Sequence, residues 1–448
     1  MDWYLLRLKE FGDAVAFRED EGDTTYRQLT SQIHLIERHL LDSGIASGDV
    51  VVVRGRSDSR LFAAVLAVMH LDAIAVPLTD QSPIAASVAI EIATAQFSLS
   101  TDNLILERVG DDYPVQSNHR LLEELRTEKL GGLILFSSGS TGTPKAILYD
   151  SERLLRKFEA DRKPIKALSF LMMDHFGGLN TVFSITSCGG EAITLEDRNV
   201  DTVCAAVERH RVKVLPVTPS FIRLLIMSGA KQRYDLSTLE KITFGTEPMT
   251  RSTLDQLARH FPGVELQQTY GLTEVGVLRS KSRPDGTLWM KIGGEGFDWK
   301  IKEGTLWIRS EFQMRGYLNA EADIDEDGYF NTQDEVLVDG EYIQVLGRVS
   351  DVINVGGEKV YPAEVENFLE GIENIAAVAA YGELNSLLGQ VIAVDIMLVN
   401  EEELGMLRKR VREACSRSLG KNKVPSKIRV VAEIPISVRM KRLRHTGN

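Results

Sequence analysis

The chain is poor in cysteine. Its 448 residues include only Cys188, Cys204 and Cys415, and long stretches of sequence separate the three thiols. Three scattered cysteines cannot form the disulfide framework of a secreted protein, and their spacing does not match a zinc cluster. We therefore expect a protein that works in a reducing, cytoplasmic environment.

Basic residues are in the minority. The formal net charge is -12 at pH 7, which argues against a nucleic-acid-binding surface over the whole protein. The balance reverses in the segment from Glu401 to the end, where 13 lysines and arginines stand against 5 acidic residues. A solvated helix face with a basic tail would explain the excess of basic residues in this segment. The alternative, functional interpretation is a surface that binds a phosphate-rich partner.

Long apolar runs are also missing. The first residues, Met1 to Glu10, include acidic side chains and lack the apolar stretch of a secretion signal. The most apolar region, Leu61 to Leu78, is interrupted by His70, Asp72 and Pro77. This region predicts a buried helix followed by a short strand, so no membrane span is expected.

Helical and strand patterns alternate through the first two thirds of the chain. Such alternation predicts an α/β fold with largely parallel sheets. The expected helices include Thr30 to Leu41, Leu61 to Met69, Val203 to His210 and Pro219 to Met227. The expected strands include Asp49 to Val53, Ala73 to Val76, Val212 to Val217 and Lys241 to Phe244.

The pattern of expected secondary structure changes near residue 286. Short strands with turn signals predict a β-rich subdomain over about residues 286–347, with strands at Thr305 to Ile308, Asp325 to Phe330 and Asp339 to Leu346. The last hundred residues have the length of a compact domain. We expect a large domain over residues 1–348 and a small α+β domain over 349–448.

The most informative segment is Ser137-Ser-Gly-Ser-Thr-Gly-Thr-Pro-Lys145, which follows the apolar run Leu133 to Phe136. A strand that leads into small hydroxyl and glycine residues exposes backbone N–H groups and hydroxyl donors, and the lysine adds positive charge. The pattern differs from the common nucleotide loop, because Pro144 precedes the lysine and Ala146 follows it. A phosphate-binding loop is the functional interpretation, and a plain connecting loop is the alternative.

Other segments are ordinary when each is taken alone. Gly245-Thr246-Glu247-Pro248 has the composition of a turn, and Gln268 to Glu274 that of a strand end. Asp334 and Arg348 read as surface charges, and Lys441 as a solvated lysine near the chain end.

Taken together and in this order, the segments resemble the adenylate-forming superfamily. This superfamily comprises acyl-CoA synthetases, peptide-synthetase adenylation domains and firefly-type luciferases. The resemblance begins with the segment Thr24 to Leu29. It continues through the phosphate loop, the Tyr270-Gly-Leu-Thr-Glu274 block and Gly347-Arg348, and it ends with the segment Pro435 to Arg444. It is nearest to acyl- and aryl-CoA ligases and implies a large α/β domain with a β-rich subdomain and a small mobile C-terminal domain.

The resemblance implies a role for each matching residue. Thr273 would contact the α-phosphate of ATP, Glu274 would bind Mg²⁺, and Lys441 would bridge the α-phosphate and the attacking carboxylate. His175 would stand at the mouth of the acyl pocket. The β- and γ-phosphates of ATP would be bound by Ser137, Ser138, Gly139, Ser140, Thr141, Gly142, Thr143 and Lys145. The adenine would be bound by Gly245, Thr246, Glu247, Pro248 and Tyr270, and both ribose hydroxyls by Asp334 with the help of Arg348.

The small domain would close in two orientations, one for each half-reaction. Residues after Arg348 would form the hinge, where Ser350 takes the place of the usual Asp or Lys. Gly356 and Gly357 would line the tunnel for the thiol arm, where a backbone without Cβ allows close passage. The implied cofactors are ATP, Mg²⁺ and CoA, with the phosphopantetheine of an acyl-carrier protein as the alternative acceptor.

Two departures from the superfamily pattern concern large side chains. Gln333 and Met440 occupy positions that are usually glycine. If the backbone has a positive φ there, each substitution costs on the order of 1–3 kcal/mol of strain. They also motivate a third hypothesis, a non-catalytic nucleotide-binding homologue.

The resemblance implies that the substrate is a small carboxylic acid. Amino-acid-activating relatives carry an Asp after the position of His175, whereas this chain has Phe176. The sequence therefore favours an aryl or aliphatic acid over an amino acid.

Overall fold

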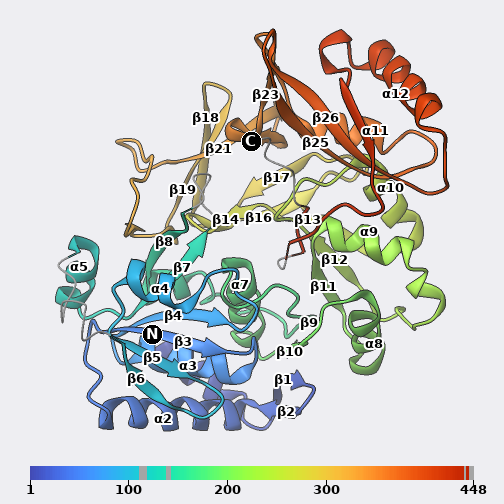
Figure 1. Ribbon diagram of the computed structural model, residues 1–448. Coiled ribbons are helices and arrows are strands. Elements are labelled where there is room, and N and C mark those ends of the chain that lie inside the picture. The colour runs from blue at the N-terminus through green and yellow to red at the C-terminus, as the bar shows by residue number, and fades with distance from the viewer. Residues whose placement is uncertain (110–118, 138–142, 438–439, 443–448) are drawn as a thin grey trace.

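The fold is described here from a computed structural model (Figure 1). It covers residues 1–109, 119–137, 143–437 and 440–442. Among these residues, no helix is both long and apolar enough to cross a membrane.

The first sheet, sheet I, is parallel at its centre and antiparallel at both edges. Strands β4, β3 and β5 run parallel, and β4 also pairs in parallel with β7. Their order in space is β20 (Gly316–Tyr317), β8 (Lys145–Asp150), β7 (Gly132–Ser137), β4 (Ile74–Thr79), β3 (Val50–Gly55), β5 (Phe97–Ser100), β6 (Leu106–Arg108).

The second sheet, sheet II, is parallel except at β2. Its order in space is β13 (Glu265–Gln268), β12 (Lys241–Phe244), β11 (Val214–Val217), β9 (Lys166–Leu168), β10 (Glu191–Ile193), β1 (Val15–Glu19), β2 (Gly22–Thr25). In Figure 1 sheet I lies on the left and sheet II on the right.

Helices separate and cover the two sheets. One hydrophobic core contains side chains from both sheets together with α3 and α7, so these helices lie between the sheets. Helices α4 and α5 pack on the other face of sheet I, and α8, α9 and α10 on the other face of sheet II. The helices of this part are α1 (Asp2–Glu10), α2 (Tyr26–Asp42), α3 (Ser59–His70), α4 (Ala86–Ala93), α5 (Arg120–Glu128), α6 (Ser151–Arg156), α7 (Phe176–Thr186), α8 (Val200–His210), α9 (Pro219–Met227), α10 (Arg251–His260) and the 3₁₀ turn η1 (Ala230–Gln232).

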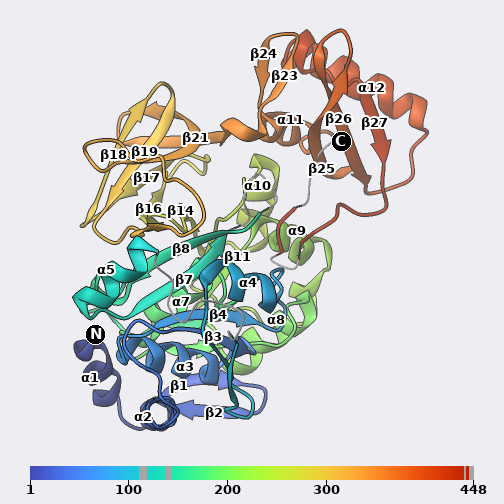
Figure 2. The ribbon, with the colours of Figure 1, turned by 60° about the vertical axis from the view of Figure 1, so that its left-hand side comes forward.

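Sheet III is antiparallel and forms the predicted β-rich region. Its strands in spatial order are β16 (Arg279–Ser282), β17 (Met290–Gly293), β22 (Tyr342–Arg348), β21 (Phe330–Asp339), β19 (Thr305–Ser310), β18 (Phe297–Lys302). A short hairpin of β14 (Gly271–Leu272) and β15 (Gly276–Val277) leads into it. Figure 2 shows sheet III beside the β8 edge of sheet I.

The expected strand from Asp325 to Phe330 is wrong. Residues 325–329 form a turn, in which Asp325 Oδ1 accepts hydrogen bonds from the backbone N–H groups of Asp327 and Tyr329. The aspartate side chain thus takes over the backbone bonds that a strand would have used.

The C-terminal part has a sheet of its own, sheet IV. It contains β24 (Glu358–Val360), β23 (Ile353–Val355), β26 (Gly389–Leu398), β25 (Ile375–Asn385) and β27 (Lys427–Val430), the last pairing with β26. Helices α11 (Pro362–Leu369) and α12 (Leu404–Ser418) pack on it, and η2 (Val349–Asp351) and η3 (Lys421–Lys423) are short turns. The domain boundary after Arg348 stays a prediction.

The expected helices are present; α9 has the predicted bounds, and α2, α3 and α8 begin earlier than predicted. Helix α2 begins before Thr30 because Thr25 and Gln28 form a capping box at its start. Helix α3 begins before Leu61 because the Asp58 side chain caps it. Capping side chains therefore extend both helices beyond their apolar patterns.

Candidate active site

The predicted phosphate loop joins two antiparallel strands. Ser137, the last residue of β7, pairs with Lys145, the first residue of β8. Ser138, Gly139, Ser140, Thr141 and Gly142 lie outside the described residues. Thr143 is exposed, and Ala146 lies in the extended backbone of β8 with its N–H donating to Asn319 Oδ1 at 2.9 Å.

A tyrosine that sequence reasoning missed links Lys145 and Glu274. The Lys145 amine lies 5.0 Å from the centre of the Tyr317 ring, and the Tyr317 hydroxyl donates to Glu274 Oε1 at 2.7 Å. Burial, and then the charge of Glu274, raise the pKa of Tyr317, so the hydroxyl keeps its proton. Thr273 and Glu274 lie in the turn between β14 and β15. Tyr317 had no signal to distinguish it from a core aromatic.

The predicted ribose-binding residues lie together. Asp334 on β21 is the register partner of Arg348 on β22, and Arg348 Nε is 3.5 Å from Asp334 Oδ1. The Tyr270 hydroxyl donates to Asp334 Oδ2 at 2.5 Å. Burial raises the pKa of Asp334, while Arg348 and the hydrogen bond from Tyr270 oppose this rise. The structure thus brings three predicted nucleotide residues into contact.

The predicted adenine-binding turn follows β12 and is tightly packed. A Cβ on Gly245 would lie 2.3 Å from Thr269 Oγ1, so only glycine fits there. Thr246 has a φ of 69° and is exposed, as is Pro248. Glu247 Oε1 accepts from the N–H of Ser220 at 2.6 Å, and Oε2 accepts from the N–H of Arg442 at 2.9 Å. Glu247 therefore binds the C-terminal tail, a contact that the sequence did not indicate.

His175 and Lys441 come together from distant parts of the chain. His175 is the N-cap of α7, and its Nδ1 accepts from the Gly177 N–H at 3.0 Å. The carbonyl of Lys441 accepts a hydrogen bond from the Ser437 N–H at 2.8 Å. Both side chains line one small void of about 10 Å³, whose other walls are Phe170, Leu171, Met172 and Arg198.

The hinge and tunnel residues are not at this void. Ser350 is exposed in η2, and its hydroxyl donates to Asp351 Oδ1 at 3.0 Å. Gly356 and Gly357, with φ of 60° and 92°, form the turn between β23 and β24. In Figures 1 and 2 this hairpin lies at the end of the C-terminal part that is farther from sheets I and II. Their hinge and tunnel roles stay predictions.

Gln333 and Met440, which stand at positions that are usually glycine, both have a positive φ. Gln333 has a φ of 61° and Met440 a φ of 55°. Both residues therefore adopt the left-handed conformation that normally favours glycine.

A larger cavity lies next to the void at Lys441. Its volume is about 370 Å³, and none of the predicted site residues lines it. It shares Phe170, Leu171, Met172 and Arg198 with the void. Residues that follow β3, β4, β9 and β10 supply much of its lining, at the carboxyl ends of parallel strands where ligands bind in α/β folds. No sequence motif indicates this cavity, because its lining comes from separate segments.

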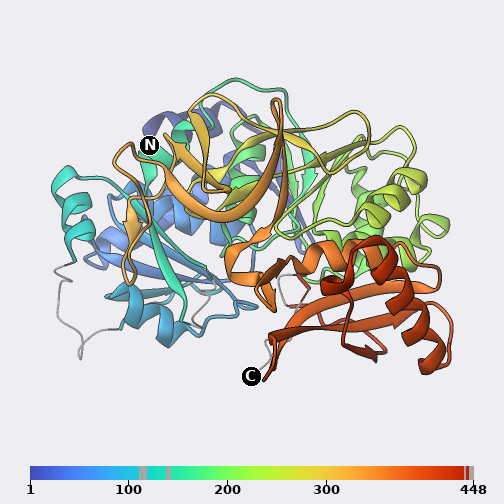
Figure 3. The ribbon, with the colours of Figure 1, turned by 90° about the horizontal axis from the view of Figure 1, so that it is seen from above.

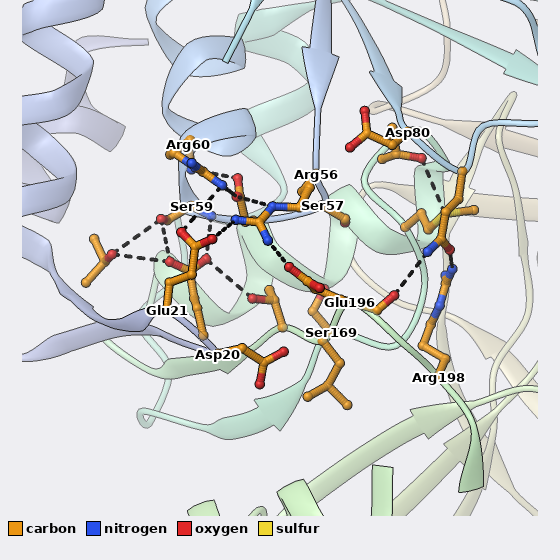
Figure 4. Close-up of a pocket in the computed structure, with 18 of the residues that line it drawn as sticks. Asp20, Glu21, Arg56, Ser57, Ser59, Arg60, Asp80, Ser169, Glu196 and Arg198 are labelled. Carbon is orange, nitrogen blue, oxygen red and sulfur yellow. Dashed lines mark hydrogen bonds and ion pairs between the residues drawn. The ribbon is translucent and has the colours of Figure 1, made fainter. Parts of the chain in front are cut away.

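Carboxylates outnumber guanidinium groups in the lining of this cavity. Figure 4 shows Arg56 between Glu21 and Glu196, both of which it contacts in ion pairs. Arg60 pairs with Asp58 at 2.7 Å, and Arg198 donates to Gln81. The lining contains the acids Glu19, Asp20, Glu21, Asp23, Asp58, Asp80 and Glu196 and the arginines Arg56, Arg60 and Arg198.

Two family profiles together match most of the chain. A sequence profile of the AMP-binding enzyme family matches residues 6–318, and the profile of the AMP-binding enzyme C-terminal domain matches residues 364–441. The chain belongs to this family, and the superfamily predicted from its motifs is confirmed.

Its relatives include acid–CoA ligases. The chain is 28% identical to an indoleacetate–CoA ligase of Aromatoleum aromaticum, over 94% of this chain and 92% of that protein. It is 26% identical to 4-coumarate–CoA ligase-like 2 of Arabidopsis thaliana, over 90% and 82%.

Solved structures share the whole fold. The amide bond synthetase McbA from Marinactinospora thermotolerans has a TM-score of 0.82 at 21% identity, over 98% of this chain and 97% of that one. The anthranilate CoA ligase AuaEII, in complex with anthranoyl-AMP, has a TM-score of 0.82 at 18% identity, over 98% and 95%. The predicted fold class, with a large and a small domain, is confirmed.

Proposed function

We propose that this protein activates an aryl or aliphatic carboxylic acid with ATP, releases pyrophosphate, and transfers the acyl group to the thiol of CoA. The observation that carries the proposal is that Lys441 and His175 line one void. Two further contacts support it: Tyr317 links Lys145 to Glu274, and Arg348 pairs with Asp334. The acid–CoA ligases among the relatives support the choice of acceptor.

The chemistry accounts for these residue types. Oxide is a poor leaving group, so a carboxylate becomes an acyl donor only after it attacks the α-phosphate of ATP. Two anions then meet, and positive charge must offset their repulsion. Lys441 supplies that charge beside the acid, and Lys145 supplies it at the departing pyrophosphate.

Magnesium fits the residues present. Among the described residues, no group of three or more His, Cys, Asp or Glu side chains forms a metal cage. Mg²⁺ is commonly bound by one or two carboxylates together with substrate phosphates and water. Glu274 can provide such a carboxylate, since Tyr317 fixes one of its oxygens and leaves the other for the ion. The ion would neutralise phosphate charge.

The packing of Phe176 supports an acid without an α-amine. Phe176 is 5% exposed and stacks on Tyr149, with ring centres 5.4 Å apart. Its ring therefore faces the core and leaves no partner for an ammonium group at that position. The relatives are named for aromatic acids, indoleacetate and coumarate, and we propose an aryl acid as the substrate.

The acidic cavity favours a second candidate function, amide formation with a cationic amine. The cavity adjoins the void at Lys441, and its lining has more carboxylates than guanidinium groups. This charge attracts an amine and repels the phosphates of CoA. The acyl-adenylate carbonyl would form a C–N bond, AMP would leave, and the amine would lose a proton. McbA, a fold relative, is named as an amide bond synthetase.

The experiment first measures carboxylate-dependent exchange of labelled pyrophosphate into ATP with a panel of aryl, short-chain, long-chain and amino acids. Lys441→Ala should abolish most of this exchange and keep ATP binding. Exchange by no acid, with ATP binding intact, would instead support a non-catalytic nucleotide-binding homologue.

The acceptor is identified in a second step, with the acid that supports exchange. CoA, a phosphopantetheinylated carrier protein and agmatine are offered in turn, and thioester or amide is measured by mass spectrometry. Thioester with CoA alone supports the proposal, and amide with agmatine supports the second candidate. Asp20→Asn/Asp80→Asn should weaken agmatine use, with Asp327→Asn as the surface control.

A further inference from the structure

The arginine that follows Lys441 is buried against the C-terminal part. The Arg442 side chain is 6% exposed, and its NH1 lies 3.0 Å from Glu366 Oε2. Its NH2 donates to Glu370 Oε1 at 2.7 Å, and NH1 also donates to the Val378 carbonyl. Because Glu366 lies on α11, Glu370 directly follows it and Val378 lies on β25, the side chain of Arg442 is fixed to the C-terminal part.

The main chain around Lys441 is instead bound to the large part of the molecule, which contains sheets I, II and III. The Thr218 hydroxyl donates to the Met440 carbonyl at 2.6 Å, and the Arg442 N–H donates to Glu247 Oε2 at 2.9 Å. Thr218 is fully buried at the start of α9. The residues on both sides of Lys441 are therefore held, and the position of the lysine is determined from both parts of the molecule.

Glu370 joins the two parts directly. Its Oε2 accepts from the Thr250 hydroxyl at 2.6 Å, and its Oε1 lies 3.9 Å from Arg223 NH1. Thr250 caps α10 and Arg223 lies on α9, both in the large part. Figure 3 shows the C-terminal part, in orange and red, beside the green segment that contains these helices.

Nearby carboxylates compensate the charges of Arg442 and Arg223 to different extents. Burial by itself lowers the pKa of Arg442, but the carboxylates of Glu366, Glu370 and Glu247 outweigh burial and raise it. Burial, and then the charge of Arg442, lower the pKa of Arg223. Arg442 is thus the well-compensated cation, bound to α11, whereas the charges of Glu370, Glu247 and Glu366 compensate Arg223 only in part.

We propose that Arg442 is a positioning residue for Lys441, and that Arg223, Thr250, Glu366, Glu370 and Arg442 form a latch between the two parts. The latch delivers Lys441 to His175 only when α11 is seated on α9 and α10. A rotation of the C-terminal part for acyl transfer must break the contacts of Glu370 with Thr250 and Arg223, and it leaves the Arg442 pairs intact. This inference rests on the proposed acid activation.

The test separates the two half-reactions in the full-length protein. Adenylation is measured by pyrophosphate exchange with the acid that supports it in the unaltered protein. Acyl transfer is measured by adding the synthetic acyl-adenylate and CoA, or agmatine if that is the acceptor found. Arg442→Met should lower exchange roughly 10- to 100-fold, as expected for a misplaced catalytic group, and leave transfer nearly unchanged.

Arg442→Met leaves two buried carboxylates without their cation, so the variant can be unstable. Arg442→Met/Glu366→Gln/Glu370→Gln removes those charges together and keeps acceptors for the Ala380 and Val378 N–H groups. It should show the same selective loss of exchange. Arg442→Lys should recover part of the exchange, because an ammonium can pair with one carboxylate.

Arg412→Met is the matched control. Arg412 lies on α12, and its guanidinium donates to the Pro425 and Ser426 carbonyls within the C-terminal part. The rate of pyrophosphate exchange by Arg412→Met should equal that of the unaltered protein. Equal losses of exchange and transfer in the triple variant, or no loss in either, would overturn the latch. Absence of exchange in the unaltered protein would overturn the proposed function instead.

Discussion

Asp334 lies opposite Arg348 on the paired strands β21 and β22, and Arg348 Nε is 3.5 Å from Asp334 Oδ1. The aspartate is 7% exposed, and Tyr270 contacts its other oxygen at 2.5 Å. A buried carboxylate held from two sides has a fixed direction, as bidentate binding of two ribose hydroxyls requires.

Asp334→Asn should weaken ATP binding about 10- to 100-fold, because a hydrogen bond to a charged group contributes about 1.5–3 kcal/mol. Isothermal titration calorimetry measures the affinity. Asp339→Asn, at the exposed end of the same strand where Asp339 pairs with Arg283, is the control. Unchanged affinity in Asp334→Asn would remove Asp334 from the nucleotide site.

Tyr317→Phe should raise the Mg²⁺ concentration for half-maximal exchange about tenfold, since a partner that orients a metal-binding carboxylate is typically worth 10- to 100-fold. The phenylalanine ring still faces Lys145 but cannot donate to Glu274. A magnesium titration of the exchange rate tests this. Tyr329→Phe, which loses a hydroxyl bound to Asp298 on the surface, should leave the titration unchanged.

Gln333→Gly should stabilise the protein by about 0.5–1 kcal/mol. Relief of the positive φ of 61° is worth about 1–2 kcal/mol, and the greater freedom of glycine in the unfolded chain offsets part of it. The urea midpoint should rise. Gln344→Gly, within β22, should lower the midpoint, because that strand residue gains no relief. A fall in the midpoint of Gln333→Gly would mean that the glutamine side chain compensates its strain.

Because Lys157 is buried, the free energy of unfolding should rise with pH. Burial lowers the pKa of Lys157 to about 7, and its amine donates to Asn180 Oδ1 and the Val277 carbonyl. An unfolded lysine titrates near its ordinary value of about 10.4. Between these two pKa values the unfolded chain binds more protons, so the unfolding temperature should increase from pH 7 to pH 10.

Lys157→Met should flatten this pH dependence. Lys213→Met, which removes an exposed lysine paired with Glu240, should retain it. Thermal melts across the pH range compare the three proteins. Equal slopes in Lys157→Met and the unaltered protein would show that Lys157 is not the group responsible.

The sequence predicted the parts of the fold that depend on local pattern. The Thr30 to Leu41 and Leu61 to Met69 helices follow from apolar spacing, and their true ends depend on the Thr25 and Asp58 caps. The Asp325 to Phe330 strand failed because one aspartate side chain formed a turn with neighbouring N–H groups.

The sequence predicted site residues only where they form motifs. Asp334, Tyr270 and Arg348 were predicted from motif order, and the structure places them in contact. Tyr317 belongs to no motif, and within the Pro435 to Arg444 segment the resemblance assigns a role to Lys441 alone. The roles proposed for Tyr317 and Arg442 rest on contacts with residues distant in the chain. The acidic cavity is assembled from separate loops, so its charge was not visible in any one segment.

The hydrogen bond from Thr250 to Glu370 also limits how this protein can be recombined with its relatives. Exchange of the segment after Arg348 brings in a new partner for Thr250 and Arg223, which remain in the recipient. Functional hybrids should therefore be those that carry both sides of this contact from one parent, whatever the overall identity of the two sequences.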